Sequence, residues 1–133
     1  DLQAFLGLRQ IEKASWAASF RNRNHLRYAE NLKGHVDYQD WGNNFPVSIS
    51  FGVLAKNSEH RRKIVAKLVE CGIETRIFSA GNLGVHPFWT NLYDRFEDEI
   101  SNRIHSCGFF LPNYPELELA DIDYISDVVK SVE

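Results

Sequence analysis

The sequence predicts an α+β fold, formed by residues 1–133 as one domain in which helices pack on a short sheet. Apolar residues recur every three or four positions in some segments and every second position in others, the two periods of helices and strands. These segments alternate in the order helix, strand, helix, strand, helix, strand, helix, without an internal repeat. With 133 residues, of which 44% are hydrophobic, the chain is long enough for one domain with a buried core.

The first element predicted is one long helix over residues 1–33. Gly34 stands where a helix C-cap belongs, and no proline interrupts the segment. The apolar positions at helical spacing are Leu2, Phe5, Leu8, Ile11, Trp16 and Phe20. The turn-forming residues that follow, over 35–46, predict an irregular connection.

Three strands are predicted, and we expect them to share one sheet. Strict alternation of apolar and polar residues marks Val47–Leu54 and Ile73–Phe78, and a short apolar run ending at a proline marks Cys107–Leu111. Helices are predicted between them, from Ser58 to the glycine at 72 and over residues 91–106. A last helix is predicted to begin at Asp121.

Composition excludes several classes of function. The net charge of −3, without a concentrated basic patch, argues against a nucleic-acid partner. No apolar stretch approaches the roughly 20 residues that span a bilayer, and no signal peptide is visible. Two cysteines are too few for a disulfide scaffold or a metal cage. We therefore expect a cytoplasmic protein without a metal site or a membrane contact. The lack of methionine indicates a fragment or a processed product.

The segment that follows the second predicted strand carries the candidate binding residues. Arg76 lies near the strand end, and its planar guanidinium suits a phosphate or a carboxylate. Gly81 lets a ligand approach the backbone, and Asn82 offers both a donor and an acceptor. His86 lies in the same loop beside a proline. The alternative is a surface arginine followed by a turn built from glycine and asparagine.

Several short motifs, in the right order, resemble the second half of enzymes of the DegT/StrS family. These motifs are residues 1–4 (DLQA), 7–8 (GL), 10–13 (QIEK), 21–24 (RNRN), 72–76 (GIETR), 80–82 (AGN) with Pro87, 110–112 (FLP) and 119–122 (LADI). Members of that family are pyridoxal-phosphate (PLP) enzymes with the aspartate aminotransferase fold that act on nucleotide-linked keto sugars. The resemblance implies that residues 1–133 are the small C-terminal domain of such an enzyme, with residues 1–33 as a long connecting helix.

What the resemblance implies about function is specific. The complete enzyme would bind PLP and act on a nucleotide-linked 4-keto-6-deoxy sugar, in the biosynthesis of polysaccharide or lipopolysaccharide sugars. Either an aminotransferase or a C-3 dehydratase is possible: the arginine followed by Ala-Gly-Asn is similar to the dehydratase branch, whereas Ile77 stands where that branch commonly has proline. Arg76, Gly81, Asn82 and His86 would bind the substrate.

The resemblance also implies what lies elsewhere in the family. The Schiff-base lysine, or the histidine that replaces it, belongs to an N-terminal large domain, and the complete protein is expected to be a homodimer. The lysines here lie on polar faces, so we expect no catalytic residue in this chain, no PLP bound by it alone and no activity of the isolated chain. A non-catalytic, stand-alone α+β binding or assembly domain is the alternative.

Overall fold

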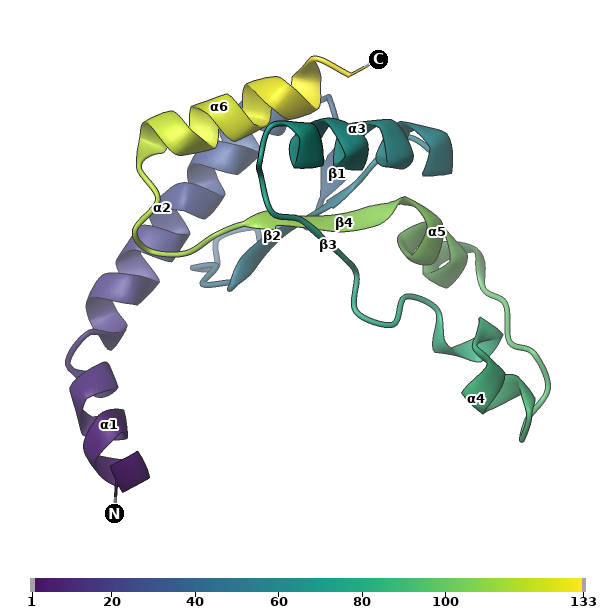
Figure 1. The fold of residues 1–133 in the computed structure, drawn as a ribbon, viewed down its shortest axis with the longest axis horizontal. Helices are drawn as coiled ribbons and strands as arrows, with labels where there is room; N and C mark the ends of the chain where they lie inside the picture. Colours follow the sequence, from purple (N-terminus) through teal and green to yellow (C-terminus); the bar gives the residue numbers. More distant parts are fainter. Residues whose placement is uncertain (1, 133) are drawn as a thin grey trace.

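A computed structural model describes residues 2–132 of the chain (Figure 1). The elements are α1 (Leu2–Ile11), α2 (Ala14–Leu32), β1 (Asp37–Tyr38), β2 (Ser50–Leu54), α3 (Ser58–Glu70), β3 (Arg76–Ile77), a 3₁₀ turn η1 (Leu83–Val85), α4 (Pro87–Thr90), α5 (Glu99–Cys107), β4 (Gly108–Pro112) and α6 (Leu119–Lys130). Within this part of the chain, no helix has both the length and the apolar character needed to cross a membrane. The predicted α+β class is confirmed.

The four strands form one antiparallel sheet in the order β1-β2-β4-β3. The prediction that three strands share a sheet is therefore confirmed, although β2 and β3 are shorter than their predicted ranges and β4 begins one residue later than predicted. Phe110 of β4 is the centre of the register, because it lies opposite Gly52 of β2 on one side and Arg76 of β3 on the other. The fourth strand, β1, lies within the segment that was predicted to be irregular.

Helices α2, α3 and α6 cover one face of the sheet, as Figure 1 shows. The alternate residues of β2 and β4 that point to this face are buried, among them Phe51, Val53 and Phe109. Phe51 stacks on Tyr28 of α2 with ring centroids 5.0 Å apart, and it is fully buried. Leu111 of β4 and the apolar residues of the helices complete this core. The helical residues in it include Leu32, Ile64, Leu68, Ile122, Ile125, Val128 and Val129.

Polar contacts fasten α2 to α6 at the surface of this core. Arg27 makes a two-pronged ion pair with Asp123, with Nε–Oδ1 and Nη2–Oδ2 distances of 2.7 and 2.9 Å. The guanidinium of Arg27 lowers the pKa of the Asp123 carboxyl to about 2. Asn31 also donates to Asp123, at 2.7 Å. The two helices are therefore held in a fixed relative position above the sheet.

The predicted continuous helix over residues 1–33 is interrupted, which corrects that prediction. Helix α1 ends at Ile11, and the backbone N–H of Lys13 bonds to the carbonyl of Gln10, three residues back rather than four. Helix α2 then begins at Ala14. No residue of α1 is buried, whereas α2 packs on the sheet and on α6. The helical pattern of the sequence therefore spans two segments with different surroundings.

The predicted helix over residues 91–106 is also too long, because α5 begins only at Glu99. Asp98 caps α5, and its carboxylate accepts the backbone N–H of Ser101 at 2.9 Å. The apolar residues that suggested a longer helix, such as Leu92 and Phe96, are exposed and form no buried stripe. Similarly, Asp121 does not begin α6 but is its third residue, and Glu118 caps the helix.

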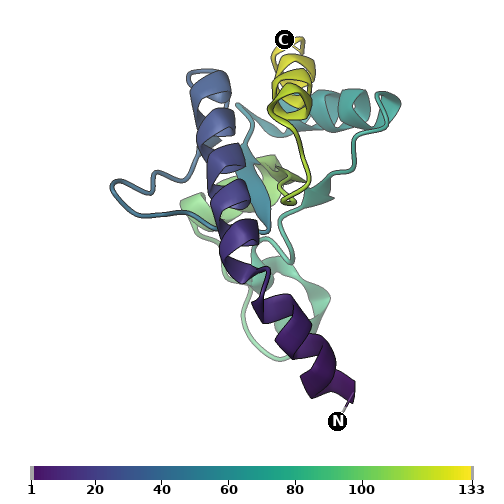
Figure 2. The same cartoon turned by 90° about the vertical axis from the view of Figure 1, so that its left-hand side faces the viewer.

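Two segments project from this body on the side that the helices leave uncovered. One is α1, which continues the line of α2 away from the body (Figure 2). The other, which we call the arm, comprises residues 79–98 and carries η1 and α4 (Figure 1). Their exposed apolar side chains are Leu2, Phe5, Leu6, Leu8 and Ile11 in α1, and Leu83, Phe88, Leu92, Tyr93 and Phe96 in the arm.

Candidate functional site

The candidate site lies at the β3 edge of the sheet, where the open face meets a groove that reaches α6. Arg76 shares this face with Phe110, its partner across the β3–β4 pair. Phe78, two residues further on, packs against Phe110 with ring centroids 4.4 Å apart. A side chain at Gly108 would collide with Phe78, because a Cβ there would lie 2.2 Å from the ring. The sheet thus fixes the end of β3 through an aromatic contact.

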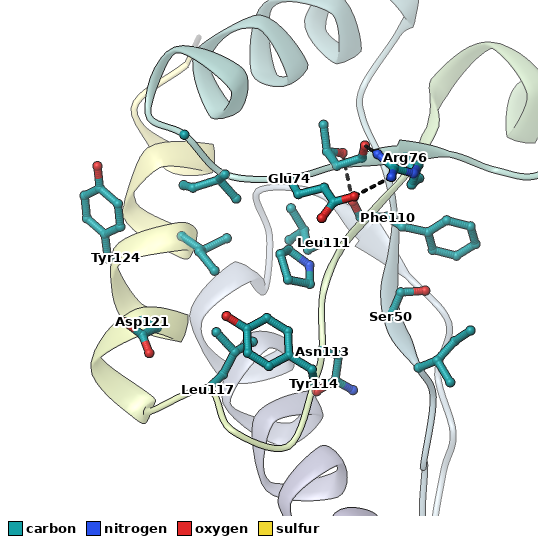
Figure 3. Close-up of a pocket in the computed structure, with 16 residues that line it drawn as sticks. Ser50, Glu74, Arg76, Phe110, Leu111, Asn113, Tyr114, Leu117, Asp121 and Tyr124 are labelled. Atoms are coloured by element: carbon teal, nitrogen blue, oxygen red, sulfur yellow. Dashed lines mark hydrogen bonds and ion pairs between the residues drawn. The ribbon is translucent and has the colours of Figure 1, made fainter.

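A groove of about 530 Å³ begins beside Phe110 and extends toward α6 (Figure 3). Its polar lining residues are Ser50, Glu74, Thr75, Arg76, Asn113, Tyr114, Asp121 and Tyr124. Apolar residues that include Ile73, Leu117 and Ile125 form the rest of the wall. A concave surface with a few convergent polar groups is the usual form of a small-molecule site.

Arg76 is the cationic group of this groove. Its side chain is 72% exposed and pairs with Glu74, the residue two positions earlier on the same face of the chain (Figure 3). Its Nη1 also donates to the carbonyl of Thr75 at 3.3 Å. An exposed ion pair of this kind is weak, so an incoming phosphate can replace the carboxylate of Glu74. The side chain of Arg76 is thus accessible from solvent, and its role in binding an anion stays a prediction.

Asn82 is placed differently, because it is 4% exposed and held within the chain. Its Nδ2 donates to the carbonyl of Phe96 at 3.2 Å and to Oδ1 of Asn102 at 2.7 Å. Its Oδ1 accepts the backbone N–H of Gly84 at 2.9 Å. Both amide hydrogens of Asn82 are thus used inside the arm and its junction with α5.

Gly81 and His86 complete the same turn. Gly81 has a φ of +58°, and a Cβ there would lie 2.3 Å from Nδ1 of His105, so the close approach is to α5 of the same chain. That Nδ1 accepts the backbone N–H of Asn82 at 3.2 Å. His86 donates from Nε2 to the carbonyl of Ala80 at 2.5 Å. Three of the four predicted site residues therefore lie together in one turn, and Arg76 lies apart on the sheet.

A second hollow, of about 520 Å³, lies on the other side of Phe110. Its walls include His25, Tyr38, Trp41, Gly52 and Phe78. His25 is 5% exposed, and burial lowers the pKa of its imidazole. The ring of His25 lies edge-on to Phe51, at a centroid distance of 4.7 Å. This hollow is aromatic and gives the open face a second concavity.

The described residues include no buried lysine of the kind that forms a Schiff base with PLP. A lysine that forms a Schiff base is desolvated and has a depressed pKa. No lysine among residues 2–132 is buried, and the hydrogen bond to Glu70 raises the pKa of Lys67. Across residues 2–132 the structure also contains no group of three or more His, Cys, Asp or Glu side chains that could hold a metal ion.

Several residues that shape the site were missed by sequence reasoning. Asn102 and His105 follow Asn82 by 20 and 23 positions, and no local spacing signals their contact with it. Asn24 of α2 is fully buried and donates to the carbonyl of Tyr114, which fixes the turn beside the groove. Arg23 donates to Oδ1 of Asn24 at 2.8 Å and supports the same turn.

Comparison with solved structures identifies the fold. The chain superposes on GDP-4-keto-6-deoxy-D-mannose-3-dehydratase from E. coli, with bound hydrated PLP, at a TM-score of 0.80 and 23% identity. It superposes equally well, also at 0.80 and 23%, on a DegT DnrJ EryC1 StrS aminotransferase from Brucella abortus. Each alignment covers 93% of this chain and 33% of the other. The chain therefore has the fold of one part of these enzymes.

Comparison of the sequence with known families identifies the family of this chain. Residues 1–130 match the DegT/DnrJ/EryC1/StrS aminotransferase family, and the chain belongs to that family. It is 28% identical to the lipopolysaccharide biosynthesis protein RfbH of Salmonella typhimurium over 133 residues. It is 30% identical to dTDP-4-dehydro-2,6-dideoxy-D-glucose 3-dehydratase of Saccharopolyspora spinosa over 142 residues. These alignments cover 94% and 97% of this chain but only 30% and 29% of the relatives.

Proposed function

We propose that this chain is the C-terminal, substrate-side domain of a PLP-dependent enzyme that acts on a nucleotide-linked 4-keto-6-deoxy sugar. Within this class we propose removal of the C-3 hydroxyl rather than amino transfer. The observation that carries the proposal is Arg76 followed by Ala80-Gly81-Asn82, in a chain that is 30% identical to a nucleotide-sugar 3-dehydratase. PLP, held by the rest of the enzyme, would supply the electron sink for this chemistry.

Arg76 is proposed to hold a phosphate of the nucleotide. Support comes from its position on the open face, beside a groove of about 530 Å³, and from the exposure of its side chain. When substrate binds, phosphate oxygens would replace the carboxylate of Glu74 as the partner of Arg76. Two of these oxygens would accept hydrogen bonds from the planar guanidinium. Gly81, Asn82 and His86 lie in the adjoining turn, where they are proposed to form the border of the substrate site.

The rest of the polypeptide is proposed to pack against α1, the arm and the open face between them. The matched relatives are about three times as long as the aligned segment, so an N-terminal large domain is the expected partner. All the apolar residues of α1 are exposed, and a ten-residue helix is marginally stable in water by itself. An apolar helix of this kind needs a partner surface. The complete protein is proposed to be a cytoplasmic homodimer.

The test is substrate turnover by the complete polypeptide, reconstituted with PLP, with and without Arg76→Ala. A charge-assisted contact to a phosphate is worth about 1.5–3 kcal/mol, so kcat/KM should fall roughly ten- to a hundred-fold. Arg62→Ala is the matched control, because Arg62 is an equally exposed arginine on α3. Thermal stability should be unchanged in both variants. Wild-type kinetics of Arg76→Ala would eliminate the phosphate contact.

The product distinguishes the competing functions. A 3-deoxy nucleotide sugar supports the dehydratase, whereas an amino sugar formed from glutamate identifies an aminotransferase. A start codon immediately before Asp1, with no large domain encoded upstream, would instead support a stand-alone binding or assembly domain. A large domain encoded in the same reading frame, with a lysine or histidine at the Schiff-base position, is the result that we expect.

A further inference from the structure

The arm lacks an apolar core of its own. Among residues 79–98 only Asn82 and Gly84 are buried, and one of them is polar while the other has no side chain. The large side chains of the arm, such as Phe88 and Leu92, are 59% and 76% exposed. Hydrophobic burial within the described chain therefore cannot hold the arm in place.

Hydrogen bonds at the base of the arm hold it in place instead. Asn82 binds four partners there: the carbonyl of Phe96, Oδ1 of Asn102, the N–H of Gly84 and Nδ1 of His105. A backbone bond of 3.1 Å from the N–H of Phe96 to the carbonyl of Gly84 closes the same loop. Asn82 thus links the first residues of the arm, the last residues of the arm and α5.

We propose that Asn102 and His105 are positioning residues that act through Asn82, and that these three residues form a polar latch. The latch would set the position of the arm and of Arg76 at the edge of the substrate site. The proposal rests on the proposed function of this face. It assigns Asn82 a positioning role instead of a substrate contact, because both amide hydrogens of its buried side chain are used inside the latch.

The route from the latch to Arg76 is short. The N–H of Gly81 bonds to the carbonyl of Phe78 at 2.8 Å, so the turn held by the latch begins at Phe78. Phe78 packs against Phe110, and Arg76 pairs with Phe110 across the sheet. A displaced turn would therefore shift Phe78 and, with it, the short strand that carries Arg76.

The test is a pair of variants at Asn102 in the complete polypeptide. Asn102→Leu has nearly the same shape but no acceptor for Asn82, whereas Asn102→Asp keeps an acceptor oxygen in that place. Asn91→Ala is the control, because Asn91 is exposed and lies in the arm outside the latch. Hydrogen exchange is followed at the amides of Gly84 and Phe96. We expect exchange at least about ten-fold faster in Asn102→Leu and close to wild type in the other two.

Kinetics of the same proteins test the positioning role. We expect kcat/KM to fall about ten-fold in Asn102→Leu and to stay within about two-fold of wild type in Asn102→Asp. Residues that act as one unit are not additive. The double variant Asn82→Ala/Asn102→Leu should therefore be no worse than Asn82→Ala.

Each contrary result has a distinct meaning. Unchanged exchange in Asn102→Leu would overturn the latch, with or without an active enzyme. Faster exchange with wild-type kinetics in Asn102→Leu, together with a loss of activity in Asn82→Ala, would show that Asn82 contacts substrate directly and would overturn its positioning role. If the wild-type protein turns over no nucleotide sugar, the proposed function fails, and the exchange measurement still decides whether the latch exists.

Discussion

The helix-covered body and the two projecting segments use similar apolar residues in opposite ways. In the body, Tyr28, Phe51 and Phe109 are fully buried between α2, α3, α6 and the sheet. In α1 and the arm, Phe5, Phe88 and Leu92 are each more than half exposed. Apolar residues therefore stabilise the body by burial within the chain. In α1 and the arm they can be buried only by contact with another surface. We therefore expect α1 and the arm to be the regions that contact a partner.

The sharpest way to break this comparison is to truncate one phenylalanine in each region. Phe51→Ala removes a fully buried ring that contacts Tyr28, His25 and the sheet, and it should cost about 3–5 kcal/mol of unfolding free energy. Phe88→Ala in the arm should change it by less than about 0.5 kcal/mol, since the ring is 59% exposed. Chemical denaturation of both variants measures the difference. Equal losses would show that the arm belongs to the same cooperative core.

A smaller effect is expected from a buried polar contact of the body. Asn24→Ala leaves the carbonyl of Tyr114 without its donor and leaves Arg23 with the carbonyl of Leu117 as its remaining acceptor. The loss should be about 1–3 kcal/mol of unfolding free energy. Asn31→Ala, at a more exposed position on the same helix, is the comparison variant and should lose less. Melting temperatures of the two proteins test this order, and a reversed order would contradict the assignment.

The smallest effect concerns pH. Burial lowers the pKa of His25 in the folded state below 6.5, so the unfolded chain binds more protons as the pH falls through that range. Stability should therefore be highest at neutral pH and decline from about pH 6.5 downward. His25→Gln cannot bind this proton and should show a shallower decline. Unfolding free energies at pH 8 and pH 5.5 give the comparison, and equal slopes in the two proteins would argue against it.

Acid effects of the ion pair between α2 and α6 lie in a separate pH range. Arg27 lowers the pKa of Asp123 from 3.8 to about 2, so the stability that this carboxylate contributes is present above pH 3.8 and lost as the pH falls toward 2. The measurement between pH 8 and 5.5 therefore reports His25 without a contribution from Asp123. The other histidines are common to both proteins and cancel in the comparison.

Within the candidate site, the surroundings of Arg76 follow from the sequence better than those of Asn82, and the binding role of both residues stays a prediction. Alternation of apolar and polar residues predicts that Arg76 is exposed, and its side chain is 72% exposed. Ile77, which the same alternation places on the apolar face, is also 63% exposed. The partners of Asn82 lie in α5, and no period connects residues 82 and 102. An asparagine next to a glycine fits a ligand site and a structural turn equally well, and only the folded contacts separate the two.

The sequence by itself determined the α+β class, the presence of three of the four strands, the covering helices and the family of this protein. Those properties depend on local periodicity and on short motifs, which a chain carries in any conformation. The tertiary structure alone decided where apolar periodicity means burial. The patterns of α1 and residues 91–98 are helical in sequence, yet no residue of α1 is buried and residues 91–98 are not helical. Packing partners, rather than periodicity, decide between burial and exposure, and in these two segments the contacts within the described chain bury no residue.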